Sequence, residues 1–297
     1  MPALLTPNDA ATKEARLIDV LRGYQQAMVA FSAGVDSTYL LAVAHAVLGE
    51  RVVAVTADSP SLARTSLAEA EAFCREHGIR HIVVPTDEFE REEYLANDGR
   101  RCYHCKSALM RAMNGLAAAT IRERGAVALL IGAIADDLGD YRPGMQAAGE
   151  AGARWPLADL GFTKVEVRER SRARDLASWN RAAEPCLSSR VPYGERVTVA
   201  GLRMIEQAEA VLKTLGFAVC RARHHQIGQP SDQQRGFLCR IEVPSADLPR
   251  LVALREQVVP AIQALGYANV TIDLAGFTSG GFNALLQRTP DPAPRTP

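Results

Sequence analysis

The sequence predicts an α/β protein in which a parallel-sheet domain is followed by a smaller α+β domain. In the first half of the chain, short runs rich in β-branched residues alternate with longer helical patterns, which is typical of βαβ units covered by helices on both faces. After about residue 199 the order changes to helix, strand, strand, helix, strand. With 297 residues, 47% of them apolar, the chain is long enough to form two hydrophobic cores.

Four strands are expected in the first domain, because each of four short apolar runs is bounded by turn-forming residues. They are 27–32, 51–57, 80–86 and 126–133. The helices expected between them are 38–48, 66–78 and 106–124, with a loop carrying the motif RCYHCK before the third. A further helix is expected over 163–177 and starts at a capping box. In such a box the Thr163 side chain accepts a hydrogen bond from the main chain of the first turn, and the Glu166 side chain accepts one from the Thr163 N–H.

An ordered loop over 182–198, with two prolines and a glycine, is predicted to separate a first domain of residues 1–181 from a second of residues 199–288. The elements expected in the second domain are a helix over 199–216, strands over 217–225 and 237–244, a helix over 246–266 and a strand over 268–276. The tail, 289–297, is proline-rich and has no apolar face, which predicts disorder.

The charge balance argues against a nucleic-acid or membrane partner. Lys plus Arg (34) equals Asp plus Glu (34), so no excess positive charge attracts phosphate or anionic lipid over long range. No stretch approaches the roughly 18 uninterrupted apolar residues of a membrane span, and the N-terminus lacks a basic-then-apolar signal layout. We therefore expect a cytoplasmic protein.

The segment SAGVDS, residues 32–37, joins a predicted strand to a predicted helix, where main-chain N–H groups and the helix dipole favour an anion such as phosphate. Gly34 allows close approach of the main chain, and Ser32 and Ser37 add hydroxyl donors. Asp36 repels a bare phosphate but fits one that a magnesium ion bridges. A capped helix start explains the same residues without a ligand. The loop is not of the Walker type, because it lacks the glycine-lysine-serine ending.

Six cysteines in a chain expected to stay reduced favour metal binding or catalysis over disulfides. Cys102 and Cys105 precede a predicted helix, whose N-terminus favours thiolates. One possibility is a zinc site, but zinc needs four ligands and His104, between the two cysteines, fits poorly as a third. The other possibilities are a redox dithiol and two cysteines that share no site. If Cys186 joins the pair, three thiolates suit a 4Fe–4S cluster with one open iron. The cysteines expected to be small buried apolar residues are Cys74, Cys220 and Cys239.

Arg221 and Arg223 alternate on a predicted strand, so both side chains project from one face and could grip a phosphate. The alternative is a pair of exposed strand arginines with no ligand. Asp137, Asp140 and Arg142 lie in a turn-rich segment that could shape a nucleotide or substrate loop, although turn capping also explains the aspartates. The same two interpretations, a role in the site or a purely structural one, apply to Ser189, Arg190, Tyr103 and Lys106.

The SAGVDS loop resembles the SGGxDS signature of the PP-loop ATP pyrophosphatases, which cleave ATP between its α and β phosphates and transfer AMP to an oxygen. Ala33 stands where that superfamily has its second glycine, and it fits if the main chain there does not need a positive φ. The nucleotide-binding residues that this resemblance implies are Ser32, Ala33, Gly34, Val35, Asp36 and Ser37, with Asp137 and Arg142.

Further blocks are similar to the LarE family of sulfur transferases, which help to build the nickel-pincer nucleotide cofactor of lactate racemase. They follow the family's order from about residue 14 to residue 285, and CLSSRVPYG is the most specific. The blocks are RCYHCK (101–106), GAIADDLGDYRPGMQAA (132–148), EPCLSSRVPYGERVT (184–198), CRARHH and CRIEV.

The resemblance implies an AMP-forming sulfur transferase that acts on pyridinium-3,5-dicarboxylate mononucleotide with MgATP. LarE proteins occur in two forms: one sacrifices the sulfur of a cysteine at the position of Cys186, and the other uses Cys102, Cys105 and Cys186 to hold a 4Fe–4S cluster that delivers sulfide. This chain has all three cysteines, which favours the cluster form. The resemblance also places Arg221 and Arg223 in an anion site, and Glu209 and Glu242 in the same pocket.

The partners that the resemblance implies are a sulfide or persulfide donor, other proteins of nickel-pincer biosynthesis and further copies of the chain. A tRNA thiolase would share the loop, the adenylation and three cysteines, but zero net charge and 6% aromatic residues argue against it. A nucleotide- or cluster-binding module without turnover is the alternative from another class. Release of pyrophosphate from ATP separates that module from either enzyme.

Overall fold

The computed structural model describes residues 9–139, 142–228 and 236–278. It divides into two compact units, of which the first comprises residues up to Glu90 together with Cys102–Glu184, and the second comprises Arg91–Arg101 and the chain from Pro185 onward. The expected fold class is confirmed, because the first unit is built on a parallel sheet and the second is a smaller α+β unit. Nothing in the sequence pattern predicts that residues 91–101 belong to the second unit.

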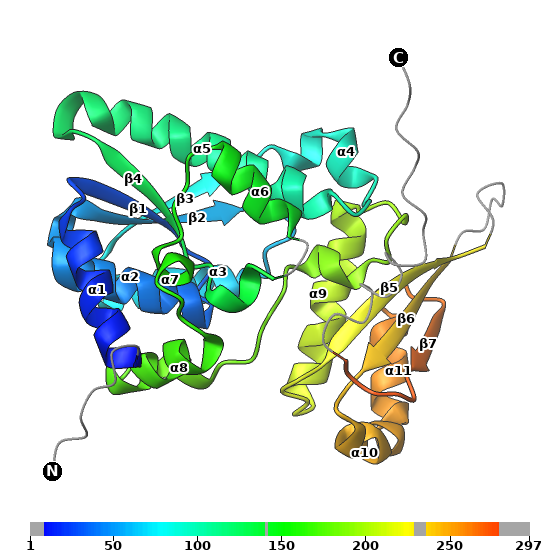
Figure 1. Cartoon of the computed structure of the whole chain (residues 1–297). Coiled ribbons are helices and arrows are strands. Elements are labelled where there is room, and N and C mark those ends of the chain that lie inside the picture. The colour runs from blue at the N-terminus through cyan, green and yellow to red at the C-terminus, as the bar shows by residue number, and fades with distance from the viewer. Residues whose placement is uncertain (1–8, 140–141, 229–235, 279–297) are drawn as a thin grey trace, which may run out of the picture. The chain divides into compact units, whose positions relative to one another are not determined.

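Four parallel strands form the sheet of the first unit in the order β3-β2-β1-β4 (Figure 1). Their bounds are β1 (Gln26–Ala30), β2 (Val52–Asp58), β3 (Arg80–Pro85) and β4 (Val127–Ile131). All four predicted strands are confirmed. Since the strands are parallel, the loops that follow β1 and its neighbour β4 emerge at one edge of the sheet, where ligands bind in open α/β sheets.

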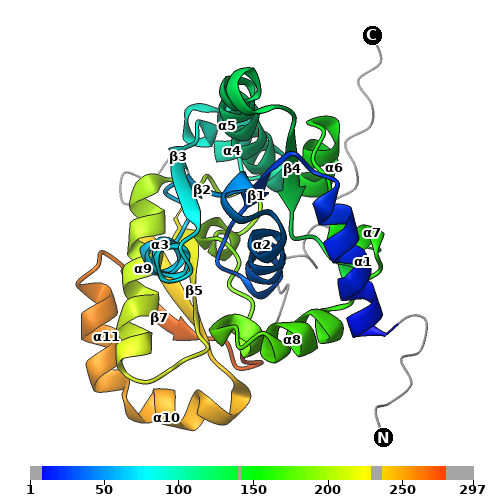
Figure 2. The same ribbon diagram turned by 90° about the vertical axis from the view of Figure 1, so that its left-hand side faces the viewer.

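Helices cover both faces of this sheet (Figure 2). One face packs against α1 (Ala10–Arg22), α2 (Val35–Leu48), α3 (Arg64–Glu76), α7 (Pro156–Asp159) and α8 (Lys164–Ala173). The other face packs against α5 (Arg101–Arg124) and α6 (Pro143–Glu150). The capping box is confirmed: Thr163 accepts from the Glu166 N–H, and the Glu166 carboxylate accepts from the Thr163 N–H.

Two helix starts differ from the prediction. Helix α5 begins at Arg101, so Cys102 and Cys105 lie in its first turns, and the expected loop before Lys106 is wrong. The Asp98 carboxylate accepts the N–H of Arg100 at 2.7 Å and starts the helical turn earlier. Helix α1 has no counterpart among the expected elements, although Asp9 caps it by accepting the N–H of Thr12 at 2.7 Å.

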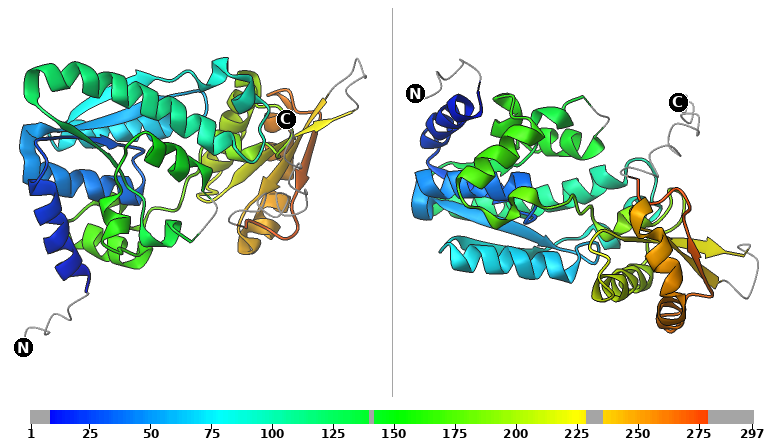
Figure 3. Two further views of the ribbon diagram at one scale, coloured as in Figure 1. Left: turned by 45° about the horizontal axis from the view of Figure 1, so that its top comes forward. Right: turned by 90° about the horizontal axis from the view of Figure 1, so that it is seen from below.

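The second unit has a three-stranded sheet in the order β5-β6-β7, antiparallel between β5 (Arg221–Ile227) and β6 (Gly236–Glu242) and parallel between β6 and β7 (Asn269–Ile272). Its core lies between this sheet and the helices α9 (Val199–Thr214) and α11 (Arg255–Gln263) (Figure 3). The helix expected over 246–266 is two helices, α10 (Leu248–Ala253) and α11, with no glycine or proline at the break to signal it. Helix α4 (Glu92–Leu95) belongs to this unit.

The strand expected over 217–225 begins only at Arg221, because the Phe217 N–H donates to the Leu212 carbonyl at the end of α9 and residues 218–219 form a bend. Part of the insertion between β5 and β6, residues 229–235, and the predicted disordered tail lie outside the described residues. In the described part of the chain, no helix is both long and apolar enough to span a lipid bilayer.

One buried carboxylate joins three helices of the first unit. Glu14 of α1 accepts a hydrogen bond of 2.8 Å from the Tyr39 hydroxyl of α2, and it pairs with Arg170 at 2.9 Å and with Arg174, which follows α8, at 2.7 Å. Burial alone raises the pKa of Glu14, but the hydrogen bonds from Arg170, Arg174 and Tyr39 lower it to about 2. Helix α8 is thereby fixed against α1 and α2.

Glu14→Gln is expected to lower the free energy of unfolding at pH 7 by about 3 kcal/mol, because the folded pKa lies well below the ordinary value. This stabilisation is complete above pH 4.5 and is lost as the pH falls through the folded pKa, so wild type and variant should converge in acid. Urea unfolding across that range measures it. Asp19→Asn, which removes the exposed Asp19–Arg22 pair, is the control and should cost about 0.5 kcal/mol or less. A pH-independent difference for Glu14→Gln would contradict the assignment.

Candidate active site

The SAGVDS loop follows β1 and enters α2 at the carboxyl edge of the parallel sheet. The hydroxyl oxygens of Ser32 and Ser37 lie 3.1 Å apart, and the Ser37 hydroxyl donates to the Gly34 carbonyl at 3.2 Å. Gly34 is the N-cap of α2, and no side-chain hydrogen bond caps this helix. The first N–H groups of α2 are therefore left to an anion.

Ala33 has a left-handed main chain, with a φ of 55°, and only 5% of it is exposed. The condition under which alanine would replace glycine without strain is therefore not met. The Ala33 carbonyl accepts a hydrogen bond of 3.2 Å from Arg181, whose guanidinium also pairs with Glu69 and Glu184. These contacts hold the loop in a conformation that L-residues adopt at a cost.

Asp36, in the first turn of α2, is bound at both carboxylate oxygens by the Lys164 ammonium, at 2.7 and 2.9 Å. Lys164 is the first residue of α8, and its N–H donates to Asp136 at 2.7 Å. Burial raises the pKa of Asp36, Lys164 opposes this, and the negative charge of Asp137 raises the pKa further. Two carboxylates, Asp36 and Asp137, are thus close enough to interact, and carboxylate oxygens are ligands that Mg²⁺ prefers.

Asp137 follows β4, the neighbour of β1, and is held on both oxygens. One accepts the Ile134 N–H at 3.0 Å and the other pairs with Arg142 at 2.7 Å. The structure therefore brings the predicted residues Asp137 and Arg142 together, while Asp140 lies outside the described residues. Gly132, at the end of β4, lies so close to α2 that a Cβ atom there would be 2.8 Å from the Ser37 nitrogen.

The first two predicted cysteine ligands lie on α5 in the first unit. Cys102 is exposed and Cys105 half-buried, and neither forms a disulfide. A Cβ atom on Gly144 would be 3.2 Å from the Cys102 carbonyl, which shows how closely α6 packs there. Cys74, Cys220 and Cys239 are buried, as predicted, and burial raises the pKa of each thiol to about 12.

Cys186 lies in the second unit, in a loop that we define as residues 185–190 and name the Cys186 loop. Its side chain is exposed, whereas Ser188 and Arg190 of the same loop are buried. Glu209 of α9 accepts from Arg190 at 2.8 and 3.1 Å and from the Ala222 N–H at 3.2 Å. The predicted residue Glu209 is therefore engaged in an ion pair next to Cys186.

Arg221 and Arg223 lie on one face of β5, as predicted, but the alternative of exposed strand arginines is wrong, because each is only 5% exposed. The Arg221 guanidinium donates to the Cys220 carbonyl at 2.7 Å and lies over the Phe277 ring. Arg223 pairs with Glu242 at 2.7 Å. Glu242 also accepts from Arg240 at 3.1 Å, which makes this face of the sheet a network of alternating charges.

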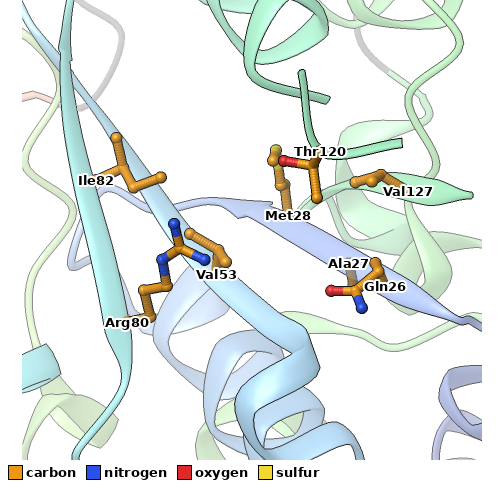
Figure 4. A pocket seen from close by; sticks show the side chains of 8 residues that line it. All are labelled: Gln26, Ala27, Met28, Val53, Arg80, Ile82, Thr120 and Val127. Atoms are coloured by element: carbon orange, nitrogen blue, oxygen red, sulfur yellow. The ribbon is translucent and has the colours of Figure 1, made fainter. Parts of the chain in front are cut away.

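A small cavity of about 10 Å³ lies at the other edge of the parallel sheet (Figure 4). Its lining includes Gln26, Val53, Arg80 and Val127, which are the first or second residues of the four strands. The SAGVDS loop follows the carboxyl end of β1, so this cavity lies away from that loop, and it has room for about one water molecule. Within residues 9–139, 142–228 and 236–278, no three His, Cys, Asp or Glu side chains gather as a metal-binding group.

Comparison with known proteins decides the family. No family model matches the chain. It is 42% identical over 265 residues to an uncharacterized protein of Synechocystis, covering 89% of this chain and 94% of the relative. It is 34% identical over 279 residues to the pyridinium-3,5-bisthiocarboxylic acid mononucleotide synthase of Lactiplantibacillus plantarum, covering 94% of this chain and 96% of that enzyme. The chain belongs to the LarE family.

Sequence reasoning missed three residues that shape the SAGVDS loop of this LarE protein: Lys164, Arg181 and Gly132. Lys164 is 128 residues from its partner Asp36, and no local pattern signals such a contact. Gly132 lies inside the predicted strand 126–133, and an isolated glycine within a strand is a signal for close main-chain approach. That signal could have singled it out.

Gly132→Ala in this LarE protein is expected to lower the free energy of unfolding by about 2 kcal/mol or more, because the added methyl group meets the main chain of Ser37. The control is Gly115→Ala on α5, where a Cβ atom meets nothing within 4 Å. That change should instead raise the free energy of unfolding by about 0.5–1 kcal/mol, through helix propensity. Urea unfolding of both variants checks the pair, and equal effects would count against the close approach.

Ala33→Gly is expected to raise the free energy of unfolding by up to about 1 kcal/mol, because glycine adopts a positive φ without the steric cost that alanine bears. Ala33→Val should lower it by about 2 kcal/mol or more, since a β-branched side chain clashes in that conformation. Asp175→Gly is the control, at an exposed position with the same φ of 55°. Urea unfolding gives the three values, and a destabilising Ala33→Gly would be the contrary result.

Proposed function

We propose that this protein is an ATP-dependent sulfur transferase that adenylates a carboxylate of pyridinium-3,5-dicarboxylate mononucleotide and converts it to a thiocarboxylate, in nickel-pincer cofactor biosynthesis. The observation that carries the proposal is the 34% identity to the synthase over 94% of this chain. The exposed thiol of Cys186, on a loop with a buried arginine, supports it.

Adenylation is needed because the oxygen of a carboxylate is a poor leaving group. In the proposed reaction, the carboxylate attacks the α-phosphorus of ATP, the bond to the β-phosphate breaks, and pyrophosphate leaves. The first N–H groups of α2 and the hydroxyls of Ser32 and Ser37 bind the departing phosphates. Asp36 and Asp137 would hold Mg²⁺, which neutralises the charge that develops on the phosphates. In this proposal the ATP site works as in a PP-loop ATP pyrophosphatase, which cleaves ATP between its α and β phosphates.

Sulfur then replaces AMP on the acyl carbon. Cys102, Cys105 and Cys186 would hold a 4Fe–4S cluster, because thiols that form no disulfide and are exposed or half-buried are the ligand type that such a cluster takes. When bound, the cluster would supply sulfide, which a sulfide donor, or a persulfide donor together with a two-electron reductant, would replenish. In the sacrificial alternative, the Cys186 thiolate attacks the acyl carbon and AMP leaves. A base then removes the Cα proton of Cys186 and the Cβ–Sγ bond breaks, which gives the thiocarboxylate and dehydroalanine.

The nucleotide's phosphate requires a positive partner, for which we propose Arg221 and Arg223. Glu242 pairs with Arg223 and orients its guanidinium. Glu209 acts beside Cys186 through its pair with Arg190. We further propose that copies of the chain associate, that other proteins of nickel-pincer biosynthesis are partners, and that the protein works in the cytoplasm. The neutral net charge argues against a tRNA substrate.

Cys186→Ala is expected to abolish thiocarboxylate formation while retaining a single turnover of pyrophosphate release, because only the second step uses the thiol. Asp36→Asn should abolish both. Cys74→Ala, at a buried thiol, is the control and should retain both. The measurements are pyrophosphate release from ATP with the dicarboxylate, and mass spectrometry of the product. Wild-type protein that binds ATP but releases no pyrophosphate would instead indicate a binding module.

Iron and acid-labile sulfide analysis after anaerobic purification separates the two sulfur routes. About four irons and four sulfides per chain, lost on substitution of any of Cys102, Cys105 or Cys186 by Ala, are expected for the cluster route. Iron-free protein that turns over once, with loss of the mass of H₂S from Cys186, would contradict it and support the sacrificial route.

A further inference from the structure

The Cys186 loop presents its main-chain carbonyl groups to arginine side chains. The carbonyls of Pro185 and Cys186 accept from Arg190, at 2.6 and 3.2 Å. The Ser188 carbonyl accepts from Arg101 at 2.8 Å, and the Ser189 carbonyl accepts from Arg223 at 3.0 Å. Four of the six carbonyls in this loop are thus bound by guanidinium groups. We name these three arginines the carbonyl cradle.

Arg190 makes the largest contribution to the cradle. It is only 2% exposed, and its charge is balanced by Glu209, which is itself 5% exposed. One nitrogen of its guanidinium serves the Pro185 carbonyl, the Cys186 carbonyl and the Ser189 hydroxyl, while the other two face Glu209. Because a guanidinium is planar and rigid, binding Glu209 on α9 fixes the direction in which Arg190 meets the loop.

Arg101 holds the loop from a different segment. Its guanidinium bridges the Ser188 carbonyl and the side-chain oxygen of Asn97, which is 2.6 Å away. Asn97 is fully buried, with a φ of 56°, and its amide donates to the carbonyls of Pro192 and Glu195 beyond the loop, at 2.7 and 2.9 Å. Residues 91–101 therefore bind the chain at Ser188 and again over residues 191–197.

Arg101 is also the residue directly before Cys102. The same guanidinium that binds the loop two residues after Cys186 thus belongs to the first residue of α5, on which Cys102 and Cys105 lie.

We propose that Arg190 and Arg101 are positioning residues, which fix the main chain of the Cys186 loop so that Sγ stays in one place while its bonding changes. This inference rests on the proposed function, in which Cys186 takes part in sulfur transfer. The carbonyls of the loop face the arginines, whereas the Cys186 side chain is exposed, so packing of the thiol cannot hold it in place. A reacting atom must lie within about 3–3.5 Å of its target, and a displacement of about 1 Å can cost 100-fold in rate.

The test compares Arg190→Gln and Arg101→Gln with Arg250→Gln in the full-length protein. Arg250 is the matched control, because its guanidinium also binds main-chain carbonyls of the second unit, at Leu215 and Gly216, but far along the chain from the Cys186 loop. Amide hydrogen exchange of iron-free protein reports the order of the loop, and Tm reports global stability. Single-turnover assays separate pyrophosphate release from thiocarboxylate formation.

Both variants are expected to speed exchange of the Ser189 and Val191 amides about tenfold or more relative to the control. Exchange in β5 and β6 should stay unchanged in Arg101→Gln, whereas Arg190→Gln also leaves the buried Glu209 unpaired and should lower Tm as well. Thiocarboxylate formation should fall about 10–100-fold while pyrophosphate release stays within about twofold of wild type. Arg101→Lys, which keeps a donor, should lose less than Arg101→Gln.

The inference is overturned if exchange near Cys186 is unchanged, or if it rises equally throughout the second unit while the two reaction steps keep their ratio, as a purely structural role predicts. Failure of the proposed function is distinguishable from both outcomes. A wild-type protein that releases no pyrophosphate refutes the function, whereas the exchange pattern still decides whether the arginines hold the loop.

Discussion

Pairing of buried charge is the constraint on which both units depend. An ion taken out of water without a partner costs several kcal/mol, so each buried charge must bring an opposite charge or hydrogen-bond donors with it. In the first unit, Glu14 requires Tyr39, Arg170 and Arg174, and this requirement fixes α8 against α1 and α2. In the second unit, Glu209 requires Arg190, and the pair fixes the Cys186 loop against α9. The charges that hold the fold together therefore also determine where the functional loops lie.

The two loops are fixed by different physical means. The SAGVDS loop is held by its place at the edge of a parallel sheet, by the close approach of Gly132 and by the start of α2, and it keeps main-chain N–H groups for an anion. The Cys186 loop contains only one short 3-10 helix, Leu187–Arg190, and is held through its carbonyls. The first arrangement is suited to binding phosphate, whereas the second leaves a thiol exposed on an ordered main chain.

The sequence predicts the elements whose signal is local. The four strands, the capping box at Thr163 and the burial of Cys74 follow from patterns only a few residues long. The early start of α5, the split of the helix expected over 246–266 and the assignment of residues 91–101 to the second unit do not, because they depend on contacts between distant segments. Asn97 illustrates the limit: its role follows from bonds to residues more than 90 positions away.

The candidate site divides in the same way. The residue types of the SAGVDS loop and the cysteine pattern point to their chemistry directly, but the partners of those residues cannot be deduced from them. Arg223 is an example. Its place on a predicted strand indicates only that it could bind a phosphate, whereas the structure shows that it binds Glu242 and the Ser189 carbonyl. A guanidinium has five donors in a fixed plane, so one arginine can hold main chain and carboxylate together. Any anion that binds Arg223 must therefore meet a guanidinium whose orientation the Cys186 loop and Glu242 already determine. Under the proposed function, this would tie substrate binding to the position of the thiol.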